Sequence, residues 1–445
     1  MTEQYKKRRT RLLKQMESGS IAIIATAPVS LRNRDADYAY RPDSDFYYLT
    51  GFAEPDSVAV LIAGKRGQAA KYILFCRERD PLKEVWDGRR AGTQGALADF
   101  AVDEAYCISQ LDERMPGLLE NKTAIYYSMG NSQSFDLKVL NWRKQVLEKV
   151  RTGVKAPHKL IAIERYIHEM RLIKDRDEIK TMRQAAKISA KAHIKAMQLS
   201  QPGLMEYQIE AALLSTFMEH GSRAPAYNSI VAGSENGCIL HYVENNSPLI
   251  DGELLLIDAG AELDCYASDI TRTFPVNGHF STEQRAIYDV VLAAQEAAIA
   301  QVKPGKRWNA PHDAAVKVLT KGLLDLGILK GSLTEAIEKE KYRRFYMHRT
   351  GHWLGMDVHD VGEYSVDGKW RELQPGMVLT VEPGLYIAPE SRGIAKKWWG
   401  IAVRIEDDVL VTSKGPDVLS RDVPKTVDKI EALMAKAKLA RSADE

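Results

Sequence analysis

Short apolar runs, separated by polar or helical segments, predict an α/β domain in the front part of this chain. Such runs, bounded by Gly, Pro or polar residues, are typical of buried strands. They occur at residues 20–27, 57–63, 72–76 and 123–127, and the segments between them, for example residues 93–100, are helical or irregular and polar. A further helical pattern ends near Arg171. We therefore expect an N-terminal α/β domain over residues 1–173 and a second domain over residues 174–445.

Two apolar runs in the second part match each other in outline. Each has a glycine, a carboxylate six positions later and a second glycine two positions after that, at residues 252–260 and 376–384. The order helix, x-Pro-Gly, helix, Gly precedes both runs, over residues 175–221 and 283–327. The first of these helices begins with Asp175 and Glu178, the pattern of a capping box. We infer an internal duplication with a pseudo-twofold axis; an accidental match is the less favoured alternative.

Two other segments have weaker patterns. Residues 40–52 are dense in aromatic and acidic side chains, and we expect a packed turn that leads into a strand. Residues 425–440 have the pattern of an exposed helix with charged ends. Neither pattern by itself predicts chemistry.

Composition narrows the class of protein. At 445 residues, with 45% hydrophobic and 27% charged residues, the chain has the profile of a soluble protein with two domains. The net charge of +2 gives no reason to expect nucleic acid or a membrane as a partner. The basic segment 1–14 has no apolar run behind it, so we do not expect a signal peptide. The four cysteines form no Cys-x-x-Cys pair, which fits a reducing cytoplasm.

The duplicated runs bring carboxylates to strand ends. Asp258 and Glu382 end the two runs, and each is followed by a second strand-like segment that carries Asp269 or Glu406. Four buried carboxylates would repel one another unless cations compensate them. Two divalent metals bridged by carboxylates are an arrangement used for hydrolysis. Oxygen-rich ligands suit Mn²⁺, although Zn²⁺, Co²⁺ and Fe²⁺ tolerate them too.

Histidines accompany this carboxylate group. His348, His352 and His359 fall within twelve residues, and His241 follows an apolar segment in the first half. A single histidine is more often a core or surface residue than a ligand. Three in a glycine-interrupted run beside a carboxylate group favour a metal or catalytic site. His348 and His352 are four apart, but no Glu follows His348, which excludes the zincin helix.

These strings resemble the aminopeptidase P family of the pita-bread hydrolases, which also include prolidase, methionine aminopeptidase and creatinase. The matching strings lie at residues 257–260, 268–273, 348–355, 357–362, 381–384 and 404–407, and the aromatic segment 41–52 resembles the N-terminal domain of that family. The resemblance covers nearly the whole chain, to about residue 419. It implies a C-terminal pita-bread α+β domain behind the N-terminal α/β domain.

The resemblance also implies the metal ligands and the reaction. The ligands would be Asp258, Asp269, His352, Glu382 and Glu406, which hold two divalent ions, with Mn²⁺ as the preferred metal. Asp269 and Glu406 would bridge the ions, and a hydroxide between the ions would attack the bond before proline. All five ligand types are present, which argues against a metal-free relative.

The remaining site residues follow from the same resemblance. Glu382 would move the proton to the leaving nitrogen, and His241 and His359 would hold the substrate carbonyl and stabilise the oxyanion. His348 and Arg404 would position the substrate, and Trp86 is a candidate substrate-binding residue. Trp353, Trp398 and Trp399 are further candidate pocket walls.

The resemblance thus predicts an Xaa-Pro aminopeptidase: an exopeptidase that removes the first residue of peptides with proline at the second position. It implies a cytoplasmic homo-oligomer, a dimer or tetramer. The alternatives are a prolidase, which cleaves only Xaa-Pro dipeptides, and a non-catalytic pita-bread binding protein. Methionine aminopeptidase is disfavoured because it does not need so large a front domain.

Overall fold

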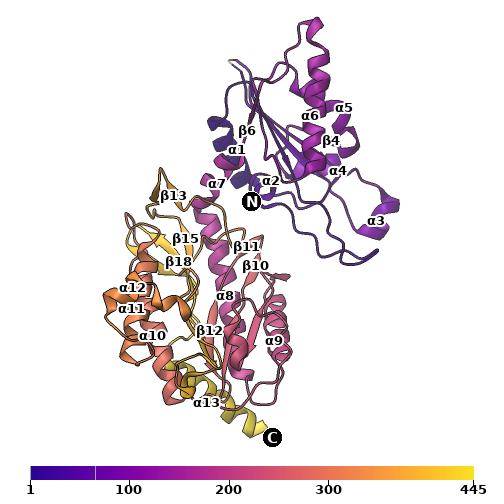
Figure 1. Ribbon diagram of the computed structural model, residues 1–445. Helices are drawn as coiled ribbons and strands as arrows, with labels where there is room; N and C mark the ends of the chain where they lie inside the picture. The colour runs from indigo at the N-terminus through magenta and orange to yellow at the C-terminus, as the bar shows by residue number, and fades with distance from the viewer. Residues whose placement is uncertain (1, 66, 445) are drawn as a thin grey trace. The chain divides into compact units, whose positions relative to one another are not determined.

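The computed structural model describes residues 2–65 and 67–444 (Figure 1). The chain divides into two compact units, Met1–Met170 and Arg171–Glu445. The division falls inside helix α7 (Glu164–Leu172), close to the boundary expected between residues 173 and 174, which itself stays a prediction.

The first unit is built on a six-stranded mixed sheet in the order β4-β3-β2-β1-β5-β6. Its strands are β1 (Ile21–Ala25), β2 (Val58–Ile62), β3 (Lys71–Cys76), β4 (Glu104–Cys107), β5 (Ala124–Tyr126) and β6 (Lys159–Ile161). Its other helices are α1 (Thr2–Gln15), α2 (Ser44–Thr50), α3 (Pro81–Asp87), α4 (Gly92–Asp99), α5 (Leu111–Leu119) and α6 (Gln133–Glu148), with short 3-10 turns η1 (Ile108–Gln110) and η2 (Val150–Thr152). Apolar side chains of β1, β2 and β3 pack against α5 and α6 in one core. The four predicted strands are confirmed, and the segment 93–100, expected to be helical or irregular, lies largely in helix α4.

The aromatic segment 40–52 was wrongly predicted as a turn that leads into a strand, because it forms helix α2. The Asp43 carboxylate accepts a hydrogen bond from the Phe46 N–H and caps the first turn. Gly51 ends the helix with a left-handed φ of 67°, a conformation that glycine adopts without steric cost. These two caps, together with burial of Phe46 and Leu49, outweigh the strand preference of the aromatic residues.

The second unit contains the duplicated halves. Its helices are α8 (Arg176–Leu199), α9 (Glu206–Glu219), α10 (Thr282–Ile299), α11 (Ala310–Asp325), α12 (Leu333–Glu338) and α13 (Val427–Asp444), with 3-10 turns η3 (Ser234–Cys238), η4 (Lys341–Arg344) and η5 (Lys396–Trp398). Its strands are β7 (Ala224–Pro225), β8 (Ile230–Gly233), β9 (Leu254–Asp258), β10 (Ala261–Leu263), β11 (Tyr266–Ala267), β12 (Thr271–Pro275), β13 (Ser365–Val366), β14 (Lys369–Trp370), β15 (Val378–Val381), β16 (Gly384–Ile387), β17 (Ile401–Arg404), β18 (Asp407–Thr412) and β19 (Gly415–Val418). Helix α8 starts with the predicted capping box of Asp175 and Glu178.

The two matching runs become β9 and β15, each paired antiparallel with the strand that begins just after the second carboxylate of its half, Asp269 or Glu406. Strand β9 pairs with β12, and β15 pairs with β18. The halves meet where the Glu406 N–H donates to the Thr271 carbonyl at 3.1 Å and the Thr273 hydroxyl donates to the Arg404 carbonyl at 3.0 Å. The fold therefore brings the ends of β9, β12, β15 and β17 to one place.

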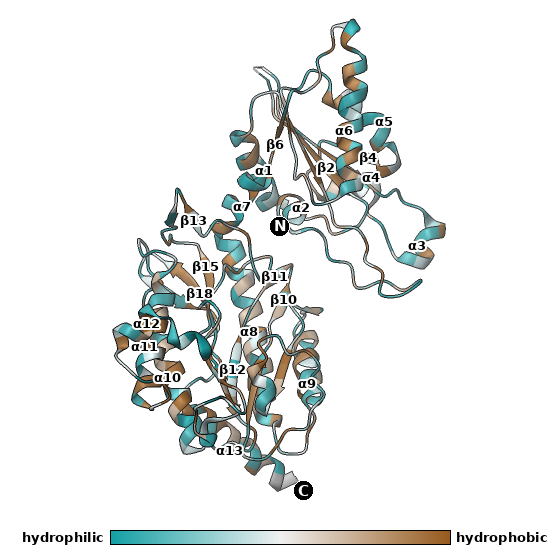
Figure 2. Cartoon of the chain, in the orientation of Figure 1, coloured by the Kyte–Doolittle hydropathy of each residue, from teal (hydrophilic) through white to brown (hydrophobic). Residues whose placement is uncertain are grey.

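The C-terminal helix α13 is not the freely exposed helix that its sequence suggested. Val427, Ile430 and Met434, spaced three and four apart, are buried in the main core of the second unit. Figure 2 shows the apolar strands of the sheets against helices with hydrophilic outer faces. Over residues 2–65 and 67–444, none of the helices is long and apolar enough to cross a membrane.

Candidate metal centre

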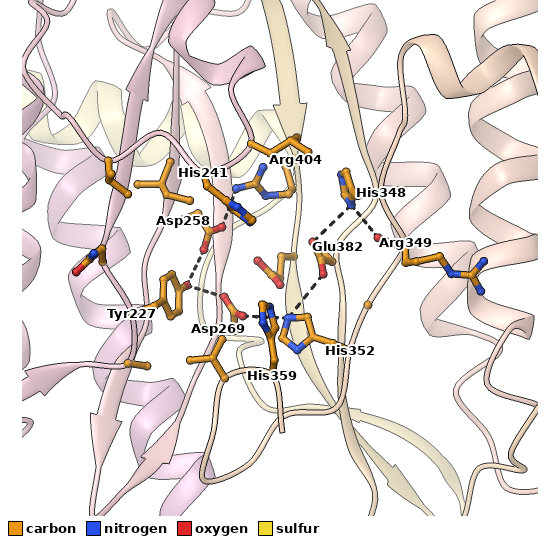
Figure 3. Close-up of a pocket in the computed structure, with 18 residues that line it drawn as sticks. Tyr227, His241, Asp258, Asp269, His348, Arg349, His352, His359, Glu382 and Arg404 are labelled. Carbon is orange, nitrogen blue, oxygen red and sulfur yellow. Dashed lines mark hydrogen bonds and ion pairs between the residues drawn. The ribbon is translucent and has the colours of Figure 1, made fainter. Parts of the chain in front are cut away.

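Acidic side chains from both halves converge in a pocket of about 670 Å³ in the second unit (Figure 3). Asp258 is the last residue of β9, and Asp269 lies two residues before β12. Glu382 directly follows β15, and Glu406 lies between β17 and β18. The predicted convergence of these four carboxylates is therefore seen, because all four line this pocket.

His352 faces two of these carboxylates. Its Nε2 lies 3.4 Å from Asp269 Oδ2 and 3.7 Å from Glu382 Oε1. Its Nδ1 lies 3.0 Å from the carbonyl oxygen of Trp353 and donates a hydrogen bond to it. This hydrogen bond orients the imidazole and turns Nε2 toward the carboxylates, as in histidines that bind metals.

The other predicted histidines surround the same pocket. His241, His348 and His359 all line it, and the rings of His352 and His359 meet edge to face with centroids 4.4 Å apart. His348 Nδ1 donates to the Arg349 carbonyl at 2.7 Å, so its Nε2 accepts the hydrogen bond from the Tyr386 hydroxyl at 2.8 Å. Burial, together with the charge of Arg404, lowers the pKa of His348 to about 4. His348 is therefore neutral at physiological pH.

Arg404 connects the two halves of the site. Its Nη2 donates to Asp258 Oδ2 at 2.7 Å, and its Nη1 donates to the Tyr386 hydroxyl at 3.1 Å. Its Nε donates to the Thr271 hydroxyl at 3.1 Å, and this hydroxyl in turn donates to Glu406 Oε2 at 2.6 Å. The guanidinium is the buried cation that holds carboxylates of both halves in fixed positions.

Tyr227 is a member of the site that sequence reasoning missed. Its hydroxyl lies 2.6 Å from Asp258 Oδ1 and 2.5 Å from Asp269 Oδ1, and its single proton can serve one oxygen at a time. The phenol therefore holds these two carboxylates together. Nothing in the string around Tyr227 relates it to residues 31 and 42 positions later.

The electrostatics of the pocket show an excess of negative charge. Burial raises the pKa of Asp258, and the charge of Arg404 offsets only part of this. Burial raises the pKa of Glu382 to about 7, and burial with the charges of Asp269 and Glu382 raises the pKa of Glu406 well above its usual range. Burial also acts to raise the pKa of Asp269, but the hydrogen bond and charge of His352, the hydrogen bond from Tyr227 and the charge of Arg404 together outweigh it and leave the Asp269 pKa below its usual value.

The residues present fit divalent cations. One ligand atom each from Asp269, His352 and Glu406 lie within 4.8 Å of one another, and Asp258 and Glu382 flank them. Burial opposes the charged form of His352, but the neighbouring carboxylates outweigh it and raise the His352 pKa to about 9. His352 therefore carries a proton on Nε2, and its positive charge compensates the neighbouring carboxylates. A metal cation bound at this place would compensate the same carboxylates. The donors are carboxylate oxygens and imidazole nitrogen, which suit Mn²⁺, Zn²⁺, Co²⁺ or Fe²⁺.

Comparison with known proteins agrees with this geometry. Residues 180–413 match metallopeptidase family M24, and residues 5–126 match the aminopeptidase P N-terminal domain. The chain belongs to metallopeptidase family M24. A Haemophilus influenzae protein named Xaa-Pro aminopeptidase is 46% identical over 432 residues, 97% of each chain.

Solved structures of this M24 family have the same fold. Pseudomonas aeruginosa aminopeptidase PepP superposes with a TM-score of 0.97 at 54% identity and covers 98% of this chain and 99% of its own. Zinc-substituted Escherichia coli aminopeptidase P in complex with product has a TM-score of 0.96 at 43% identity, with the same coverage. The predicted family and fold class, an N-terminal aminopeptidase P-type domain and a pita-bread domain, are confirmed.

The tryptophans differ from the other predicted site residues. Trp86 lies on α3 of the first unit with 87% of its surface exposed, and it is not among the pocket-lining residues; its substrate-binding role stays a prediction. Trp353 was wrongly expected to be a pocket wall, because it is fully buried and stacks on Tyr364. Trp398 is buried in the same core, and Trp399 lines a different cavity.

Proposed function

We propose that this M24 enzyme removes the N-terminal residue from peptides that have proline at the second position. The observation that carries the proposal is the set of converging carboxylates with His352, in a pocket that three further histidines also line. Relatives that share nearly the full length of the chain have the name Xaa-Pro aminopeptidase. The two alternatives, a prolidase and a non-catalytic binding protein, are not favoured by these relatives.

Asp258, Asp269, His352, Glu382 and Glu406 would hold two divalent ions, with Asp269 and Glu406 shared between them. When bound, such ions lower the pKa of coordinated water and polarise the substrate carbonyl. Asp269 and Glu406 are suited to sharing because one ligand atom of each lies within 4.8 Å of the other and of a ring nitrogen of His352. The Thr271 hydroxyl donates to Glu406 and the Tyr227 hydroxyl contacts Asp269, and these contacts would keep the two carboxylates oriented for the ions.

Glu382 is the proposed proton carrier. Its carboxylate lines the pocket and lies within 3.7 Å of both His352 and His348. Burial holds its pKa near 7, and a nearby cation would lower that value and keep the group ionised until it takes a proton. The proton then passes to the prolyl nitrogen as the peptide bond breaks, so that the leaving group departs as a neutral amine.

His241 and His359 are the proposed donors to the substrate carbonyl. Both side chains are exposed to the pocket, and burial, with the charge of His352, lowers the pKa of His359. A neutral imidazole can donate a hydrogen bond to the oxygen that becomes negative in the transition state. His348 and Arg404 would orient the prolyl segment, and apolar side chains of Ile230, Leu240 and Val358 line a surface that suits its ring.

The finer assignments are predictions as well. We expect Mn²⁺ as the metal, two ions per chain, a homo-oligomer and a location in the cytoplasm. We also propose that Trp86 contacts the substrate, because its side chain is exposed and therefore accessible.

The test compares three peptides at equal concentration with metal-loaded protein: an Xaa-Pro-Pro tripeptide, an Xaa-Pro dipeptide and an Xaa-Ala-Pro tripeptide as control. We expect release of the first residue from Xaa-Pro-Pro, with little from the control. Turnover of the dipeptide alone would establish a prolidase instead. No turnover of any peptide by protein that binds metal would support the binding protein.

A further inference from the structure

His241 lines the pocket, where its side chain is not anchored by the described residues through a hydrogen bond. Figure 3 shows it beside Asp258 and Arg404, and no hydrogen bond joins its imidazole to another described residue. It belongs to the segment 239–247, which has no helix or strand. The position of the imidazole therefore depends on whatever fixes this segment.

Glu206, the first residue of α9, binds this segment from behind. The carboxylate has no exposed surface and accepts four hydrogen bonds. Its Oε1 accepts from the Gly233 N–H at 2.7 Å and from Asn236 Nδ2 at 3.0 Å. Its Oε2 accepts from the Tyr242 hydroxyl at 2.8 Å and from the Ser247 N–H at 2.9 Å.

All four partners of Glu206 are neutral. Within the described part of the chain, no Lys, Arg or His pairs with this buried carboxylate, so the four donors and the start of α9 offset the cost of burying its charge. Hydrogen bonds to a charged acceptor are short and directional. Each donor is therefore held closely, and two of the four belong to the segment that carries His241.

Tyr242 is the direct connection between Glu206 and His241. Its ring is buried in a small apolar cluster with Ile230, Leu256 and Tyr386, and its hydroxyl reaches Glu206. His241 and Tyr242 are neighbours in a turn, in which the Tyr242 N–H donates to the Ile239 carbonyl at 3.3 Å. Anchoring the Tyr242 side chain in the core therefore restrains the backbone that carries His241, whose side chain lines the pocket.

A second anchor restrains the same segment. Asn245 is 1% exposed; its Oδ1 accepts from the Val231 N–H at 3.0 Å and its Nδ2 donates to the Ser229 carbonyl at 2.9 Å. Glu206 and Asn245 thus hold the segment to β8 and α9. We propose that Glu206 is a positioning residue for the reaction, which acts through Tyr242 to hold His241 against the substrate carbonyl. This inference rests on the proposed role of His241.

The test is a double-mutant cycle on kcat/KM for an Xaa-Pro-Pro tripeptide. Tyr242→Phe removes only the hydroxyl that meets Glu206. We expect about a tenfold fall in kcat/KM, mainly in kcat, because small misplacements of catalytic groups reduce rates strongly. In a His241→Ala background the same change should alter kcat/KM by less than about twofold, since coupled residues are not additive.

The matched control is Tyr288→Phe, which also removes one buried phenol hydroxyl, here bonded to the Lys425 carbonyl at 2.8 Å away from the pocket. It should leave kcat/KM unchanged. Glu206→Gln is the second variant: both oxygens face two donors, so the amide NH₂ must oppose at least one N–H. We expect a larger loss than for Tyr242→Phe.

The outcomes separate this inference from the proposed function. Equal effects of Tyr242→Phe in the wild-type and His241→Ala backgrounds would overturn the positioning role while the aminopeptidase activity stands. Wild-type kcat/KM in Tyr242→Phe or Glu206→Gln would overturn it too. Wild-type protein that binds metal but cleaves no Xaa-Pro-Pro peptide would overturn the proposed function itself. Far-UV circular dichroism and the unfolding midpoint of each variant show whether a loss reflects unfolding.

Discussion

Asp360 is predicted to be one of the most sensitive stabilising residues in the second unit. Its side chain is 1% exposed, and it pairs with Arg171 Nη2 at 2.5 Å and Lys174 Nζ at 2.8 Å, whose side chains are 3% and 1% exposed. Asp360→Asn keeps the size of the side chain but removes the charge that both buried cations face. Lys174 then has no anionic partner among the described residues.

Removing one partner of a buried ion pair costs about 3–5 kcal/mol, because a buried charge stays uncompensated. Arg171 keeps a second partner, Asp357, at 2.7 Å, so we expect the lower end, about 3 kcal/mol. In a unit of this size that corresponds to a fall in Tm of about 6 °C. The assay is urea unfolding and calorimetry of the full chain, with the transition of the second unit followed.

Two control variants test whether the loss of stability comes from the buried charge. Asp325→Asn makes the same chemical change at an exposed pair, where Lys321 Nζ lies 2.5 Å away with both side chains at least 60% exposed. It should cost less than about 0.5 kcal/mol. Adding Lys174→Met to Asp360→Asn should recover part of the loss, because the unpaired buried cation is gone.

The pH dependence gives an independent check. Burial raises the pKa of Asp360, but the charges of Lys174 and Arg171 outweigh it and hold the pKa below its usual value. The contribution of this carboxylate to the free energy of unfolding is therefore complete above its unfolded pKa of about 3.9. It disappears as the pH falls through the lower pKa of the folded state. The difference between wild type and Asp360→Asn should shrink below about pH 4. A loss under about 1 kcal/mol at pH 7, or a difference that grows in acid, would refute the reasoning.

Two further predictions concern the metal centre. Glu382→Gln should lower kcat on Xaa-Pro-Pro by at least about a hundredfold and leave the unfolding midpoint near the wild-type value, because it removes the proton carrier; activity above a few per cent of wild type would contradict that role. Tyr227→Phe should weaken metal affinity by about 10–100-fold, measured by competition with a chelator, because Asp258 and Asp269 lose the hydroxyl that holds them together; unchanged affinity would show that the phenol is dispensable.

Much of this fold could be predicted because its signals are local. The glycines before β9 and β15, Gly252 and Gly376, both have positive φ and turn the chain sharply into a buried run. The capping box at Asp175 depends on residues three positions apart. These features are set by neighbours in sequence, which is why their positions agree with the structure.

The wrong predictions concern segments whose local sequence is compatible with two structures. The segment that contains Phe46 could form a strand by propensity, and the caps at Asp43 and Gly51 decide for a helix. Helix α13 was recognised, but its burial depends on the core that it meets. Trp353 was expected to be a pocket wall, but its ring is fully buried in the core and stacks on Tyr364.

The sequence indicated the candidate carboxylates and histidines of the site, but not the residues that hold them in position. Carboxylates and histidines could be recognised from the repeated strand ends and the family resemblance. Tyr227 and Glu206 could not, because their importance comes from contacts with residues more than twenty positions away. Such contacts leave no spacing pattern in a single sequence.

The central claim is that Asp258, Asp269, His352, Glu382 and Glu406 hold the ions used to cleave the bond before proline. The most direct test removes metal from the protein with a chelator and titrates Mn²⁺ back while release of the first residue from an Xaa-Pro-Pro tripeptide is measured. We predict no turnover without metal, and a rise that reaches a plateau at two equivalents per chain. Full activity in the metal-free protein, or no activity at any loading, would contradict the account.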